Sequence, residues 1–185
     1  AVWEEPGQPV EIVRLSLTDA GVTRVTDLNA DLSDLADAVT TTAVSWSSPD
    51  GAPVGGILLR PKESGETTEP LPLVLLLHGG PTWLWSAAFA PAESNLMALP
   101  LAAAGAAVLL PNPRGSSGRG QDHARAIIGH MGTRDLADVM AGVDHLVDAG
   151  IADPERMAVM GLSYGGYLSA VAAARTDRFR AAVVM

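Results

Sequence analysis

The sequence contains no cysteine among its 185 residues. The protein therefore forms no disulfide, has no cysteine nucleophile and offers no thiolate to a metal. The cellular compartment stays open on this point, because secreted proteins can also lack cysteine. The four histidines do not show H-E-x-x-H or a similar ligand spacing, so we expect neither a metal nor any other cofactor.

Long apolar runs and a signal peptide are also lacking. No apolar run reaches the roughly 20 residues that span a bilayer, and the start A-V-W-E-E-P-G has neither a basic nor an apolar leader segment. These absences predict no membrane partner and favour a cytoplasmic location. The chain does not start with methionine, so a processed or truncated amino end is compatible with the sequence.

Positive charge is scarce, with 12 Lys and Arg against 21 Asp and Glu and a net charge of −9. A general nucleic-acid binder needs a basic surplus to neutralise phosphate, so this class is excluded. Hydrophobic residues make up 48% of the chain, which is typical of a globular protein. The length suits one domain, or one domain and part of another.

The amino-terminal part is predicted to form β-hairpins. Alternating apolar and polar residues predict a strand at Val10 to Leu17 with a partner at Val22 to Thr26, and 31–39 is a short helix or a linker. Thr41 to Trp46 and Val54 to Arg60 form a second alternating pair around a D-G turn. An isolated two-stranded ribbon is marginal in water, so the first hairpin is expected to belong to a larger β structure.

A different pattern begins at Leu73, after a polar surface loop at 61–72. Short continuous apolar runs are typical of strands covered on both faces, and helical segments separate them. The expected strands are 73–77, 106–110, 157–160 and 181–185, and the last of them is also expected to be buried. The expected helices are 94–104, 134–149 and 167–174, and Pro100 should kink or restart the first of them. A long turn is expected at 111–118. This order predicts an α/β fold with a doubly wound sheet.

The strongest helix signal follows Thr133, a plausible N-cap, and ends before Gly150. One apolar face runs along this helix. Its members are Leu136, Val139, Met140, Val143, Leu146 and Val147. Asp138, Asp144 and Asp148 lie away from that face, and we expect them on a solvated surface, although Asp138 could reach a loop.

The stretch R-M-A-V-M-G-L-S-Y-G-G-Y has the pattern of a nucleophile elbow. Gly161 and Gly165 flank Ser163 at i−2 and i+2, and they let the strand and the helix approach closely, with the serine Oγ exposed on a strained turn. The bare motif also fits a glycine- and serine-rich loop. A predicted strand before it and a helix after it favour the interpretation as a serine hydrolase.

An acyl-transfer serine also needs donors for the oxyanion that forms. In α/β-hydrolases one donor is the N–H after the nucleophile, here Tyr164, and the other comes from a loop after an earlier strand. The segment from His78 to Pro81, H-G-G-P, ends a predicted strand, and its glycines let N–H groups face a ligand. A strand-ending turn is the alternative, and the order of the two elements weakens it.

The base and the acid of a triad are not found after the nucleophile. The expected order is Ser, Asp or Glu, then His, but only 22 residues follow Ser163, with Asp177 and no histidine. Asp177 comes too early for the acid, and His145 is expected to pack against the helix core. Because loss of the histidine costs a serine protease about a million-fold in turnover, these residues alone should have almost no activity.

Several motifs together resemble the catalytic domain of the prolyl oligopeptidase family, in particular its acylaminoacyl-peptidase and dipeptidyl-peptidase-like branch. They are L-L-L-H-G-G-P, N-P-R-G-S-S-G, D-L-A-D-V-M-A-G-V-D-H-L, I-A-D-P-E-R-M-A-V-M-G-L-S-Y-G-G-Y and T-D-R-F-R-A-A-V-V. The resemblance implies an α/β-hydrolase with Ser163 as nucleophile, and an oxyanion hole at Tyr164, Gly79 and His78. Some relatives have a tyrosine where this chain has His78, so Gly79 is the better second donor. Arg114 is a candidate for substrate binding, with shaping of a turn as an equal alternative.

The same resemblance implies the domain organisation and the partners. Residues 1–40 are expected to be the end of a β-propeller and a linker, and 41–185 the amino-terminal part of the peptidase domain, with the triad Asp and His beyond the end of this chain. The implied partners are short peptides, and the oligomeric state, a homo-oligomer included, stays open. Two alternatives remain: an esterase or lipase of the same fold, and a non-catalytic module that retains the fold.

Overall fold

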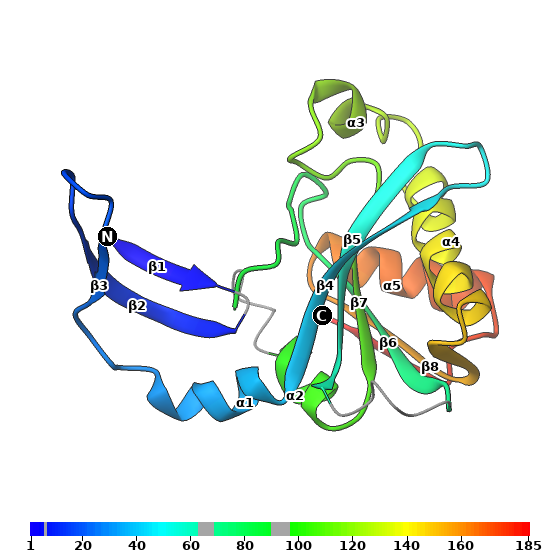
Figure 1. The fold of residues 1–185 in the computed structure, drawn as a ribbon. Helices are drawn as coiled ribbons and strands as arrows, with labels where there is room; N and C mark the ends of the chain where they lie inside the picture. The colour runs from blue at the N-terminus through cyan, green and yellow to red at the C-terminus, as the bar shows by residue number, and fades with distance from the viewer. Residues whose placement is uncertain (6, 63–68, 90–96) are drawn as a thin grey trace.

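The structure, a computed structural model, describes residues 1–5, 7–62, 69–89 and 97–185. It contains a small three-stranded sheet and a larger six-stranded sheet, which Figure 1 shows on opposite sides of a short helical segment. The elements that connect them are a 3₁₀ turn, η1 (Ala30–Leu32), and α1 (Ser33–Asp37). The expected short helix at 31–39 is confirmed.

The small sheet is antiparallel, in the order β1 (Val2–Glu5), β2 (Gln8–Leu15), β3 (Val22–Arg24). The predicted first hairpin is therefore present, and β1 extends it. Glu11 of β2 is buried, and the Arg24 guanidinium, the Thr26 hydroxyl and the Asn29 N–H all donate to its carboxylate. These donors lower the pKa of Glu11 to about 2, the Thr26 hydroxyl contributing most.

The large sheet has the order β4-β5-β7-β6-β8-β9. Its strands are β4 (Val39–Ser47), β5 (Pro53–Pro61), β6 (Leu71–Leu77), β7 (Ala107–Asn112), β8 (Ala152–Gly161) and β9 (Ala181–Val184). The pairs β4–β5 and β5–β7 are antiparallel, and β7, β6, β8 and β9 are parallel to one another. The second predicted hairpin and all the predicted later strands are confirmed.

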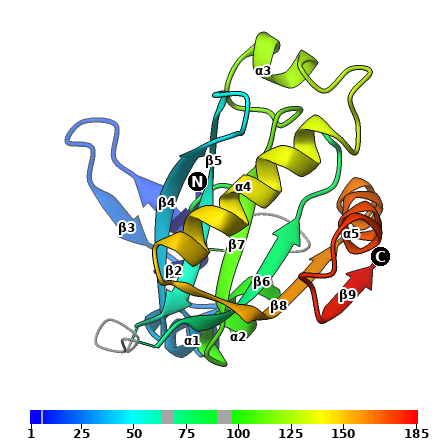
Figure 2. The ribbon, with the colours of Figure 1, turned by 90° about the vertical axis from the view of Figure 1, so that its right-hand side faces the viewer.

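Helices cover both faces of this sheet, because the apolar side chains of β6 point alternately to one face and to the other. Leu73, Leu75 and Leu77 face a core formed with α4 (Arg134–Asp148) and α5 (Tyr164–Arg175), and Figure 2 shows α4 lying across that face. Leu76 faces the opposite core, with α1 and α2 (Ala98–Ala103). A further short helix, α3 (Gln121–Arg125), follows β7. The predicted doubly wound α/β fold is confirmed.

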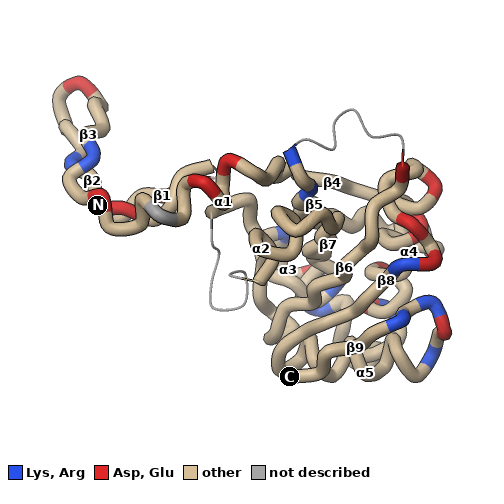
Figure 3. The backbone as a smooth tube through the Cα atoms, turned by 90° about the horizontal axis from the view of Figure 1, so that it is seen from below, with Lys and Arg blue, Asp and Glu red and all other residues tan. Residues whose placement is uncertain are grey.

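Charged residues of both signs gather at β8 and in the turn before β9, where Figure 3 shows blue and red segments side by side. They form exposed ion pairs. The pairs are Arg156 with Asp153, Arg180 with Glu155, and Arg178 with Asp144. None of the described helices is long and apolar enough to cross a membrane.

Three expectations need correction. Asp138 is fully buried, because its carboxylate is paired inside the protein. Strand β9 is exposed along its length, because β8 is its only strand neighbour among the described residues. Strand β7 runs through Asn112, so the turn expected from 111 begins later. Pro100 lies in the first turn of α2, where its missing N–H breaks no helical bond, and this agrees with the restart that was expected as the alternative to a kink.

Two expectations fall partly outside the described residues. Of the surface loop expected at 61–72, residues 63–68 are not described, and β5 and β6 include its ends. Of the helix expected at 94–104, residues 94–96 are not described, and the described helix is α2. Thr133 does occupy the N-cap position of α4, but its hydroxyl donates to the His130 carbonyl at 2.7 Å and accepts no hydrogen bond from a helical N–H.

Candidate active site

Ser163 occupies the turn between β8 and α5. Its φ of +59° and ψ of −119° place it in a region that non-glycine residues rarely adopt, and the Gly165 N–H closes the turn on the Leu162 carbonyl at 2.9 Å. The serine is exposed, at the carboxyl end of a central parallel strand. The strained strand-turn-helix geometry expected of a nucleophile elbow is thus present.

The two flanking glycines are required by close backbone contacts. A Cβ on Gly165 would lie 2.1 Å from the Leu77 carbonyl oxygen, and one on Gly161 would lie 2.4 Å from the Gly165 carbonyl. Real side chains do not tolerate such distances. The elbow can therefore lie directly against the end of β6, which brings the H-G-G-P loop beside Ser163.

The loop after β6 reaches the elbow at Gly79. A Cβ placed on Gly79 would lie 3.6 Å from the Ser163 Cβ and 3.4 Å from the Leu162 carbonyl oxygen. Within the described parts of the chain, the N–H groups of Gly79 and Tyr164 donate to no protein acceptor. Two such N–H groups, on the two segments that meet at Ser163, are suited to an oxyanion hole, and their assignment to one stays a prediction.

The His78 ring is engaged away from Ser163. Its Nδ1 lies 2.7 Å from the Gly79 carbonyl oxygen, and its Nε2 lies 2.9 Å from the Ser116 Oγ. The ring is buried and makes an edge contact with Trp85. Burial lowers the pKa of His78 below its usual 6.5, which keeps the ring neutral at pH 7. The side chain therefore links the H-G-G-P loop to Ser116, on the loop that follows β7.

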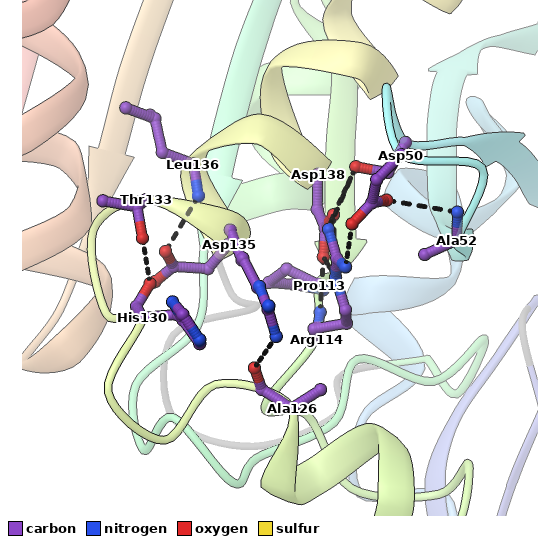
Figure 4. A network of polar contacts seen from close by, with 12 residues as sticks. Asp50, Ala52, Pro113, Arg114, Ala126, His130, Thr133, Asp135, Leu136 and Asp138 are labelled. Atoms are coloured by element: carbon purple, nitrogen blue, oxygen red, sulfur yellow. Dashed lines mark hydrogen bonds and ion pairs between the residues drawn. The ribbon is translucent and has the colours of Figure 1, made fainter.

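The loop after β7 is held by Arg114. The backbone N–H and the guanidinium of Arg114 both donate to the Asp138 carboxylate, with Nη2 to Oδ1 at 2.6 Å, and Nη1 donates to Asp50 at 2.5 Å (Figure 4). Ser48 also donates to Asp138, at 2.6 Å. Arg114 in turn lowers the pKa of Asp50 by its hydrogen bond, and the Asp138 hydrogen bond raises the pKa of Arg114. These contacts give Arg114 a part in shaping the turn, and its contact with substrate stays a prediction.

Asp135 and Tyr164 form a second buried link. Asp135 is fully buried in the first turn of α4, and the Tyr164 hydroxyl donates to its Oδ2 at 2.5 Å. Burial and this carboxylate raise the pKa of Tyr164. The phenol therefore stays protonated, and it ties the first residue of α5 to α4.

The other expected or excluded groups lie elsewhere. The His123 Nε2 is 3.1 Å from the Pro113 carbonyl oxygen, and the His145 ring stacks on Trp46, so the expected packing of His145 is confirmed. Asp177 is exposed in the turn between α5 and β9. The described residues contain no group of three or more side chains suited to a metal.

Sequence reasoning missed the contributions of Asp135 and Ser116, and it gave the contact of Asp138 with a loop only as the alternative to a solvated position. An acidic residue in the first turn of a helix is ordinarily explained by the helix dipole, and Asp138 lies off the apolar face. No local pattern distinguishes them from solvated residues. The one indication of these contacts in the sequence was the composition of the loop R-G-S, where an arginine and a serine follow two prolines.

A sequence profile described as the prolyl oligopeptidase family matches residues 92–185. The chain is 41% identical over 143 residues to "Uncharacterized peptidase YuxL" of Bacillus subtilis (strain 168). It is 38% identical over 128 residues to the acylamino-acid-releasing enzyme of Arabidopsis thaliana. These alignments cover 76% and 68% of this chain, but 20% and 16% of the two relatives.

Solved structures have the same fold over 98% of the chain. A puromycin-hydrolyzing peptidase of Mycobacterium tuberculosis matches with a TM-score of 0.85 and 30% sequence identity, and the acylaminoacyl peptidase of Pyrococcus horikoshii with 0.79 and 27%. The chain spans 27% and 28% of those chains. The mixed six-stranded sheet with its helices is the α/β-hydrolase fold of these neighbours, over the part that this chain spans.

Proposed function

Because the chain belongs to the prolyl oligopeptidase family, we propose that the protein is a serine peptidase that hydrolyses short peptides through an acyl-enzyme on Ser163. The observation that carries the proposal is the exposed serine on a strained turn at the end of a parallel strand, beside the Gly79 segment. Peptidase names among the relatives and structural neighbours support the choice of substrate class.

In the proposed mechanism the Ser163 Oγ attacks the carbonyl carbon of the scissile peptide bond. The negative charge that develops on the carbonyl oxygen is received by the N–H groups of Tyr164 and Gly79, each worth about 2.7–4 kcal/mol in the transition state. His78 serves through its backbone and its link to Ser116, since both ring nitrogens already have protein partners. The tetrahedral intermediate then collapses: the C–N bond breaks, and the amine leaves with the proton that the general base took from the Ser163 hydroxyl. Water adds to the acyl-enzyme, restores the Ser163 hydroxyl and releases the new carboxyl end.

Activation of Ser163 requires a general base and an acid that orients it. None of the hydrogen bonds of the described histidines involves Ser163. We therefore propose that both groups come from residues outside 1–185. Arg114 stays a candidate for substrate contact, in addition to the ion pairs that hold its loop.

The amino-terminal sheet is proposed to be the end of a β-propeller, with residues 1–40 forming this part and its linker, and 41–185 forming the peptidase part. Support comes from the antiparallel β1–β3 sheet, which forms no ladder with the large sheet and exposes many apolar side chains. A cytoplasmic location and a homo-oligomer stay predictions from the sequence.

The test compares the full-length protein with its Ser163→Ala variant. We expect hydrolysis of aminoacyl nitroanilides and rapid labelling by a fluorophosphonate, both lost in the variant. Hydrolysis of short acyl esters without any amide hydrolysis would contradict the peptidase and favour an esterase. Labelling that persists in Ser163→Ala would remove Ser163 as the nucleophile, and a full-length protein with neither activity nor labelling would favour a non-catalytic module.

A further inference from the structure

Asp135 is a buried carboxylate whose described partners include no cation. Its Oδ1 accepts the Leu136 N–H at 2.9 Å, and its Oδ2 accepts the Tyr164 hydroxyl at 2.5 Å. The nearest arginine in sequence, Arg134, donates instead to the Ala126 carbonyl at 3.3 Å. Burial of a carboxylate is costly unless hydrogen bonds compensate it, so the Tyr164 hydroxyl is a main partner of this group.

Tyr164 is held by its side chain as well as by the helix that it starts. Its hydroxyl donates to Asp135, and its ring lies against the Tyr167 ring with centroids 5.4 Å apart. The backbone N–H of the same residue follows the nucleophile and donates to no described acceptor. Because the hydroxyl end of the Tyr164 ring is held, the peptide between Ser163 and Tyr164 has less freedom to rotate.

We propose that Asp135 is a positioning residue for the oxyanion hole: through the Tyr164 hydroxyl, it orients the Tyr164 N–H toward the oxygen that becomes negatively charged. The inference rests on the proposed function. Asp135 does not touch the substrate, and its effect reaches the reaction only through the elbow. The strained φ of Ser163 makes an external support useful here, since the turn itself has no preference for this geometry.

A role in stability alone leads to a different expectation. If the Asp135–Tyr164 bond only joined α4 to α5, its removal would lower the melting temperature and leave the folded fraction with normal turnover. Misalignment of an oxyanion donor lowers kcat with little change in KM, because the donor acts mainly in the transition state. The division between kcat and KM therefore distinguishes the two roles.

The experiment uses the full-length protein with Tyr164→Phe, Asp135→Ala, Asp135→Asn and the double variant Tyr164→Phe/Asp135→Ala. Removal of a whole oxyanion donor costs about 100- to 1,000-fold in kcat, and a misaligned one should cost less. We expect Tyr164→Phe and Asp135→Ala each to lower kcat about 10- to 100-fold with KM nearly unchanged. The double variant should lose no more than the larger single loss, because both changes break one link. Asp135→Asn keeps an acceptor oxygen for the phenol and should recover part of kcat.

Controls separate failure of this inference from failure of the proposed function. Asp144→Asn changes an exposed carboxylate on the same helix, paired with Arg178, and should leave kcat unchanged. If Ser163→Ala keeps full activity, the proposed function fails. If Ser163→Ala is inactive while a folded Tyr164→Phe variant keeps its kcat, or changes only KM, the positioning role is overturned. Should Asp135→Ala not fold, Tyr164→Phe decides alone, because it removes a single hydroxyl.

Discussion

Arg114 and Asp138 form a buried ion pair, with 2.6 Å between Nη2 and Oδ1 and side-chain exposures of 10% and 0%. Arg114 belongs to the loop after β7, and Asp138 belongs to the second turn of α4. The Trp46 indole donates to the Asp138 carbonyl at 2.8 Å, so β4 joins the same junction. Three segments distant in sequence thus meet beside the candidate active site.

Arg114→Met should destabilise the protein by about 3–5 kcal/mol, because it leaves the Asp138 charge buried without its cation. Urea unfolding of the two proteins measures the difference. The matched control is Arg178→Met, which removes an exposed pair with Asp144 and should cost less than about 1 kcal/mol. Equal losses in the two variants would contradict the importance of burial.

Gly165→Ala should destabilise the elbow, by about 1–3 kcal/mol or more, because the added methyl would overlap the Leu77 carbonyl. In the full-length protein, labelling of Ser163 by a fluorophosphonate should fall with it. At Gly7 a Cβ would meet no described atom within 4 Å, so Gly7→Ala serves as control. A Gly165→Ala variant with normal stability and labelling would show that the close approach of β8, α5 and β6 is dispensable.

Ser116→Ala should destabilise the protein by about 1–3 kcal/mol, because it leaves the buried His78 Nε2 without its partner. Chemical unfolding at pH 7.5 measures this cost. Ser117→Ala is the control on the same loop, since its hydroxyl contacts the Thr82 carbonyl at an exposed position. If Ser116→Ala lowers the free energy of unfolding no more than Ser117→Ala does, the His78–Ser116 hydrogen bond does not stabilise the protein as predicted.

Stability should fall as the pH decreases below about 6.5, the usual pKa of histidine. Burial lowers the pKa of His78 in the folded protein, so the unfolded chain binds a proton more readily in this range, and protonation favours unfolding. Melting temperatures at pH 7.5 and 5.5 test this. His78→Asn should reduce the difference without removing it, because burial also lowers the pKa of His123. An unchanged difference in that variant would contradict the assignment.

Glu11→Gln should destabilise the amino-terminal sheet at pH 7 and should destabilise it less at pH 3. The pKa of Glu11 is about 2 in the folded protein against 4.5 normally, so its stabilising effect is full above about 4.5 and disappears as the pH falls through 2. Hydrogen exchange of the β2 amides at pH 7 and at pH 3 measures the change. Asp148→Asn, at an exposed position, is the control, and an equal effect of both variants at pH 7 would contradict this prediction.

Hairpins, buried strands and the elbow could be predicted from the sequence because each depends on neighbours within about a dozen residues. The alternation of Val10 to Leu17 and the apolar run at Leu73 to Leu77 report the faces of individual strands. The exposure of β9 could not be predicted in the same way, because it depends on which strands become neighbours.

The sequence by itself determined the nucleophile candidate, the order of strands and helices and the resemblance to a peptidase family, since local spacing and motif carry all three. Tertiary structure alone decided that Asp138 pairs with Arg114, that Ser116 meets His78, and that Asp135 receives the Tyr164 hydroxyl. The partners in these pairs are 24, 38 and 29 residues apart in the chain. Whether an aspartate is solvated or buried depends on which distant segment packs against it, and no local pattern contains that information.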